Sequence, residues 1–182
     1  DGLYNTAIGY QALNTAASSG ENTAIGYQSL FSNTVGTLNT GIGYQSLVLN
    51  TTGSQNTANG SISLTSNTTG SNNVANGYAS LYLNTAGVQN TANGATAMFS
   101  NSFGNNNGAS GFASLYLNTT GSNNVGNGVL SLYSNTTGDD NVGIGYGAGY
   151  FNQTGDANVS VGYYAGTGGG GSYASSTLLG YY

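Results

Sequence analysis

The side chains that could do acid–base or metal chemistry are few in this chain of 182 residues, because it contains no Lys, Arg, His or Cys. Only five carboxylates are present, and three of them, Asp139, Asp140 and Asp156, lie close together in the sequence. Asp139 and Asp156 are separated by a 17-residue spacing that recurs throughout the chain. If this spacing places them about 5 Å apart, they could share a hard cation such as calcium or form the carboxylate pair of a glycosidase.

A turn explains these aspartates more simply, because Asp, Asn and Ser replace one another readily in turns. A calcium site needs more oxygen ligands, and the calcium-binding GGxGxD nonapeptide is missing. A glycosidase needs a cleft that raises one carboxyl pKa, and the surface of a regular repeat offers little cleft. We therefore expect no enzyme activity and no cofactor, and Asp139 and Asp156 are only weak metal candidates.

N-glycosylation acceptor sequences, Asn-x-Ser/Thr, recur in one register of the chain. A glycan on each would form a ridge of sugars along one side of the molecule. The alternative is that Asn-Thr-Thr-Gly is simply good turn sequence, since Asn and Gly adopt positive φ readily. The sequence leaves both open for five asparagines: Asn50, Asn67, Asn118, Asn135 and Asn152.

The missing residue types exclude several classes of function. Nucleic-acid binding needs cations to neutralise phosphates, and attachment to an anionic membrane surface needs them too, but the chain has none. Zinc, haem and thiol chemistry need His or Cys. The sequence also contains no apolar run of the roughly 18 residues that a membrane span requires. We expect neither nucleic-acid binding nor membrane insertion.

The elements that position these residues come from an internal repeat whose period stays at 17 residues across ten units. Ten units begin at Asn5, and a Gly follows each initial Asn four positions later. We number the positions of the unit from 1, the Asn, to 17. Residues 1–174 form the repeat region, and residues 175–182 form a partial eleventh unit after a one-residue insertion that we place in residues 168–173. The initial residues are Asn5, Asn22, Asn39, Asn56, Asn73, Asn90, Asn107, Asn124, Asn141 and Asn158.

Each unit is too short and too rich in Gly and Asn for a helical hairpin. The TAIGY segment alternates as a strand does, and the N-T-x-G segment predicts a turn. Two short strands and two turns would make one coil of an all-β β-solenoid or β-roll. Stacking about ten 17-residue coils would align the Leu of position 9 in a common core and give a rod about 50 Å long.

Two sets of positions vary in an informative way. Position 4 is Ile in the first three units, Asn or Ser in five middle units from Asn59 to Asn127, and Ile144 and Val161 in the last two. We favour an internal Asn ladder at position 4 over a merely polar outer surface. Positions 6 and 10 are mostly aromatic. Stacked rings that stiffen the rod and contact a neighbouring chain are favoured there over platforms for glycans.

The copies at residues 22–30 (NTAIGYQSL), 39–47 (NTGIGYQSL) and 141–150 (NVGIGYGAGY) resemble the head repeats of YadA-like trimeric autotransporter adhesins. They resemble still more closely the repeats of phage-tail-fibre-like and bacterial surface proteins. The resemblance implies a β-roll or β-helix, often wound as a homotrimer, that works as a stalk or an adhesive head. The 17-residue unit is longer than the common YadA-type unit.

These observations together predict a structural segment of an extracellular fibre, on a bacterial surface or a virion. The first four residues fit the end of a repeat unit, and the chain ends within another, so we expect self-association as a homotrimer or an end-to-end fibril. The alternative is a module that binds carbohydrate or a host receptor, such as a cell-surface glycan, through its Tyr or Asn positions. Ice binding through the Thr positions is a weaker alternative, because Thr gives way to Val in the later units.

Overall fold

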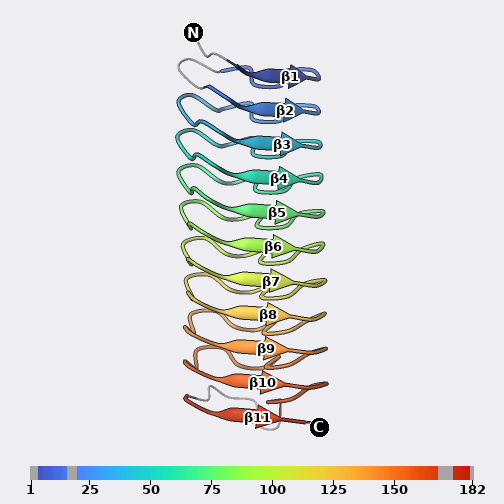
Figure 1. The fold of residues 1–182 in the computed structure, drawn as a ribbon, viewed down its shortest axis with the longest axis vertical. Coiled ribbons are helices and arrows are strands. Elements are labelled where there is room, and N and C mark those ends of the chain that lie inside the picture. The colour runs from blue at the N-terminus through green and yellow to red at the C-terminus, as the bar shows by residue number, and fades with distance from the viewer. Residues whose placement is uncertain (1–3, 16–19, 168–173, 181–182) are drawn as a thin grey trace.

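A computed structural model describes residues 4–15, 20–167 and 174–180 as a single parallel β-solenoid (Figure 1). Every coil contributes one three-residue strand, and the strands follow one another in chain order in one 11-stranded sheet. The all-β solenoid expected from the repeat is therefore confirmed. The strands are β1 (Thr6–Ile8), β2 (Thr23–Ile25), β3 (Thr40–Ile42), β4 (Thr57–Asn59), β5 (Val74–Asn76), β6 (Thr91–Asn93), β7 (Gly108–Ser110), β8 (Val125–Asn127), β9 (Val142–Ile144), β10 (Val159–Val161) and β11 (Thr177–Leu179).

The strands pair at the period of the sequence repeat. Thr23 of β2 pairs with Thr40 of β3, the equivalent residue of the next unit, and this register holds as far as β10. Between β10 and β11 the step is one residue longer, since Val159 pairs with Thr177. The extra residue lies between Ala165 and Ser175, because hydrogen bonds before and after these residues follow the two different registers. The interval in which we placed it, residues 168–173, lies outside the described residues.

The prediction of two strands per coil is wrong for the described chain, which has one strand per coil and turns elsewhere. The turns depend on residues with positive φ at positions 7, 9 and 17, such as Gln45 (50°), Leu47 (52°) and Gln55 (60°). This left-handed conformation costs non-glycine residues about 1–2 kcal/mol each, so it is rarely expected from sequence. It bends the chain tightly enough to close a coil within a single repeat unit.

The interior is thin and consists of small residues beside one row of large apolar ones. The central residue of each strand from β2 to β10, such as Ala58 or Ala75, is buried, as is the Ser or Ala of position 8 from Ser29 onward. Position 9 fills the remaining core with Leu30, Leu47, Leu64, Leu81, Met98, Leu115 and Leu132, each no more than 1% exposed. Stacked on their counterparts in neighbouring coils, these side chains form one continuous core along the rod.

Two glycines per coil allow the coils to approach one another. Gly77, at position 5, has a φ of 129°, and a Cβ on it would lie 2.7 Å from the carbonyl carbon of Gly94 in the next coil. At position 15 the obstacle is different: a Cβ on Gly104 would collide with the Gly121 carbonyl oxygen and with the Asn101 side chain. Both positions therefore exclude any side chain.

In the described part of the chain, no helix is long and apolar enough to cross a membrane.

Candidate functional site

Two ladders of asparagine side chains run through the interior along the rod axis. At position 1, the Asn39 backbone N–H donates to the Oδ1 of Asn22 at 2.9 Å, and this bond recurs in every coil from Asn22 to Asn158. At position 12, the Nδ2 of Asn50 donates to the Oδ1 of Asn33 at 2.7 Å, and this pattern continues to Asn152. Each coil is therefore bonded to the next by side chains as well as by its strand.

The two ladders meet at the glycine of position 15. The carbonyl oxygen of Gly53 accepts from the Nδ2 of Asn39 at 2.8 Å and from the Nδ2 of Asn50 at 2.9 Å. This arrangement satisfies amide groups whose burial would otherwise be costly. Among the described residues, the only buried side-chain N or O atom without a hydrogen-bond partner is the Oγ1 of Thr96.

The five asparagines with glycosylation sequences belong to the ladder at position 12. Asn50, Asn67, Asn118 and Asn135 are fully buried, and Asn152 is 2% exposed. Their Nδ2 atoms, to which a glycan would be attached, donate inward to the neighbouring Asn and Gly. The folded coil has no room for a sugar on these atoms, and the ladder itself accounts for the recurrence of Asn.

The Asn residues of position 4 do not form the internal ladder that we expected from the sequence. Position 4 faces outward: Asn59, Asn93 and Asn127 are exposed, and Ile42 is 37% exposed. Along this outer row the Nδ2 of Asn76 donates to the Oδ1 of Asn93 at 2.8 Å. The buried ladders lie at positions 1 and 12. Asn hardly varies at these positions, so the sequence does not distinguish a buried ladder from a turn there.

Asp139 and Asp156 lie in the same outer turn of successive coils. The Oδ1 of Asp139 accepts the backbone N–H of Ser122 at 2.6 Å, and the Oδ1 of Asp156 accepts that of Asp139 at 2.8 Å. The Asn105 side chain makes the same bond to Val88 at 2.8 Å. The aspartates thus occupy a turn position that Asn also fills. No group of three or more His, Cys, Asp or Glu residues that could hold a metal ion occurs in the described part.

Five of the six aromatic residues of position 10, all except Phe31, form one stack of rings. Successive ring centroids are 5.0–5.2 Å apart and the ring planes are within 9° of parallel. Partial burial, together with Tyr150 and Tyr116 on either side, raises the pKa of Tyr133 above its ordinary value. The stack consists of Tyr82, Phe99, Tyr116, Tyr133 and Tyr150.

The aromatic residues of position 6 are exposed and form continuous stacks only towards the two ends. Tyr27 stacks on Tyr10 at 5.7 Å and on Tyr44 at 5.3 Å, and Tyr146 stacks on Tyr163 at 5.3 Å. Between these stacks the rings alternate with smaller residues, in the order Ser61, Tyr78, Ala95, Phe112 and Val129.

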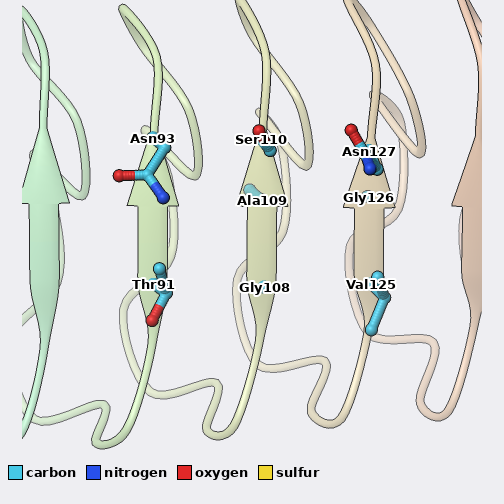
Figure 2. Close-up of a pocket in the computed structure, with 8 residues that line it drawn as sticks. All are labelled: Thr91, Asn93, Gly108, Ala109, Ser110, Val125, Gly126 and Asn127. Atoms are coloured by element: carbon cyan, nitrogen blue, oxygen red, sulfur yellow. The ribbon is translucent and has the colours of Figure 1, made fainter.

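A shallow notch of about 200 Å³ opens on the outer face of the sheet across β6, β7 and β8 (Figure 2). It exists because Gly108 and Ser110 of β7 are smaller than their neighbours, Thr91 and Asn93 on β6 and Val125 and Asn127 on β8. The notch lies in the same coils as the exposed Asn residues of position 4. The sequence period does not predict this notch. The signal that could have indicated it is Gly108 at position 2, where the other coils have Thr or Val.

In comparisons with known proteins, no protein family, no curated protein and no solved structure matches this chain. The resemblance to adhesin and tail-fibre repeats therefore stays a prediction from the NTAIGYQSL-type motif.

Proposed function

We propose that this chain is a structural segment of an extracellular fibre on a bacterial surface or a virion. The observation that carries the proposal is the unbroken position 1 ladder, in which each coil from Asn22 to Asn158 is bonded to the one before it. Such bonds run along the rod axis, so they resist bending and extension of the rod. A segment that extends or presents an adhesive end needs this property.

The near-absence of charge suits the same role. In a stack every position recurs once per coil, so a charged position would place like charges side by side at each step. Neutral Asn, Ser, Thr and Tyr can repeat and bond along the row. No charged residue occurs between Glu21 and Asp139.

Self-association belongs to this proposal, as a homotrimer or an end-to-end fibril. Exposed apolar side chains recur along the rod in rows, and rows of this kind commonly mark protein–protein contacts. One row contains Ile8 and Ile42 at position 4. At position 11 Leu49, Leu83 and Phe151 recur with serine in alternate coils, and all five side chains are at least 37% exposed.

Immunogold electron microscopy of the producing cells, and of any particles they release, tests this function. The proposal expects label along filaments outside the cell or on the particle. Label confined to the cell interior would overturn it. Light scattering on the purified chain tests self-association separately, and a monomer at high concentration would count against that part.

Ice binding has less support, because the outward Thr of the strands is interrupted by Val74, Gly108 and Val125. A thermal-hysteresis measurement separates the two functions, since a fibre segment should show no ice shaping at millimolar concentration.

A further inference from the structure

Three features of the outer face change together in the coils of residues 56–140. Position 4 changes from Ile to Asn or Ser, the ring stack of position 6 becomes discontinuous, and the notch opens at Gly108. In the coils on either side of this region, position 4 is Ile or Val and position 6 carries continuous Tyr stacks. A uniform spacer would need none of these changes, so their coincidence in the same coils indicates a local role for this face.

The rings in these coils have open faces. Both faces of Tyr27 are covered by neighbouring rings, which leaves only its edge for a ligand. Tyr78, in contrast, has Ser61 and Ala95 at the same position of the adjacent coils, and Phe112 has Ala95 and Val129. Neither ring stacks on another within the described residues, and their exposures are 58% and 55%.

The spacing of these rings leaves a slot of defined width. Stacked rings elsewhere advance by 5.0–5.7 Å per coil. Tyr78 and Phe112 are two coils apart, so their rings stand about 10 Å from each other with Ala95 between them. A six-membered ring placed midway would lie about 5 Å from each, which is close to the ordinary spacing of stacked strands and of the chain's own rings.

The polar groups beside this slot can bind hydroxyls. Asn76, Asn93 and Ser110 lie two residues before Tyr78, Ala95 and Phe112, so their backbones are within about 7 Å of these positions. Asn amides both donate and accept hydrogen bonds, as sugar hydroxyls do. Asn76 and Asn93 share one bond with each other, from Nδ2 to Oδ1, which leaves the Oδ1 of Asn76 and the Nδ2 of Asn93 for a ligand. In Figure 2, Asn93 and Asn127 stand on the rim of the notch, which leaves open space beside their amides.

We propose that the outer face of residues 56–140 binds a neutral polysaccharide. Pyranose rings enter the slots beside Tyr78 and Phe112, and Asn76, Asn93 and Asn127 bind their hydroxyls. The absence of any charge between Glu21 and Asp139 favours a neutral glycan over an acidic one. At the same position Ser61 stands between Tyr44 and Tyr78, and Val129 between Phe112 and Tyr146, so similar slots flank the one at Ala95. Repeated slots favour a polymer over a single sugar, because weak contacts in series add through avidity. This inference goes beyond the fibre role and does not depend on it.

A glycan array of neutral and acidic polysaccharides, followed by affinity electrophoresis of the full chain in gels that contain the bound glycan, tests this site. We expect binding to at least one neutral polysaccharide. Tyr78→Ala and Phe112→Ala should each weaken it about tenfold, the effect of losing one stacking contact. Asn93→Ile should weaken it too, and because Ile occupies position 4 in other coils this variant should fold.

Ala95→Tyr gives the sharpest test, because it should act in opposite directions on stability and binding. The new ring would fill the slot and complete a stack like Tyr10–Tyr27–Tyr44, so thermal stability should rise while binding is lost. Thr65→Tyr is the matched control, since it adds a ring at position 10, next to Tyr82, and fills no slot at position 6. It should raise stability and leave binding unchanged.

The proposal is overturned if no neutral polysaccharide on the array binds. It is also overturned if Ala95→Tyr stabilises the chain and binds as wild type does, or if Thr65→Tyr abolishes binding equally. Slots that are filled by a second copy of the chain would appear as an oligomer that Ala95→Tyr dissociates without any glycan binding, and that result would overturn it as well.

Discussion

The glycines of positions 5 and 15 are needed because they have no side chain, which lets adjacent coils pack closely, and not only because their backbone is flexible. At Gly104 the space that a Cβ would need is taken by the next coil and by the Asn ladder. Four residues later, Gly108 has nothing within 4 Å of where its Cβ would be, and its φ is not positive. Two glycines in one turn and strand therefore differ completely in what they contribute.

Alanine substitution at these two glycines should give opposite results. Gly104→Ala should lower the free energy of unfolding by about 3 kcal/mol, because it forces the coils apart and breaks ladder bonds. Gly108→Ala should raise it by about 0.5 kcal/mol, because it restricts the unfolded chain and fills open space. Urea unfolding measures both, and equal effects would contradict the packing described for position 15.

The left-handed residues of position 17 store strain that a conservative change can relieve. Gln55 has a φ of 60°, as does Asn72 at the same position of the next coil. Asn tolerates this conformation better than Gln does, so Gln55→Asn should stabilise the chain by about 0.5–1 kcal/mol. Thr52→Asn, on an exposed neighbour without positive φ, should change stability by less than about 0.5 kcal/mol. A gain of equal size in both variants would disprove the explanation.

At the scale of the coil, the repeat showed which residues share a position but not which positions face inward. Alternation assigns opposite faces to neighbouring residues in extended chain. Ser46 and Leu47 are adjacent and both buried, because the positive φ of Leu47 turns the chain between them. Within the strand the alternation holds, since Gly41 is buried and Ile42 is exposed. We predict the Asn of position 4 as internal because the Leu of position 9 stays constant, and we predict Asn33 and Asn50 as turn residues because N-T-x-G is good turn sequence.

The aromatic stack of position 10 gives the coil a pH dependence. The pKa of Tyr133 is raised in the folded chain by burial and by the adjacent Tyr150 and Tyr116. The folded state therefore holds this proton more tightly than the unfolded state. Its contribution to stability is complete below about pH 10, the pKa of an unfolded Tyr, and is lost as pH rises through the folded pKa.

Tyr133→Phe should remove this contribution while keeping the ring, since Phe99 already occupies the stack. At pH 8 the variant should unfold at nearly the same urea concentration as wild type. At pH 11 it should be the more stable of the two, because it has no phenol to ionise. Urea unfolding at the two pH values checks this, and an unchanged pH dependence would mean that Tyr133 does not contribute.

At the scale of the whole molecule, stability is a sum over coils and their contacts with neighbours. Removal of one complete unit, residues 90–106, should therefore leave a shorter rod with the same cooperative unfolding and a length reduced by about 4.8 Å. Removal of only residues 84–87 should be far more damaging, because a coil that lacks this turn cannot follow the same path as its neighbours. Circular dichroism and small-angle scattering compare the two deletions. Equal damage from both would show that the coils are not independent units.

The central claim is that coils stacked in register form a fibre segment, and electron cryo-microscopy of the assembly formed by the full chain tests it most directly. The account predicts filaments with the coil axis along the filament and a repeat of about 4.8 Å in that direction. Particles that do not elongate along the coil axis, or filaments with the strands parallel to their length, would contradict it.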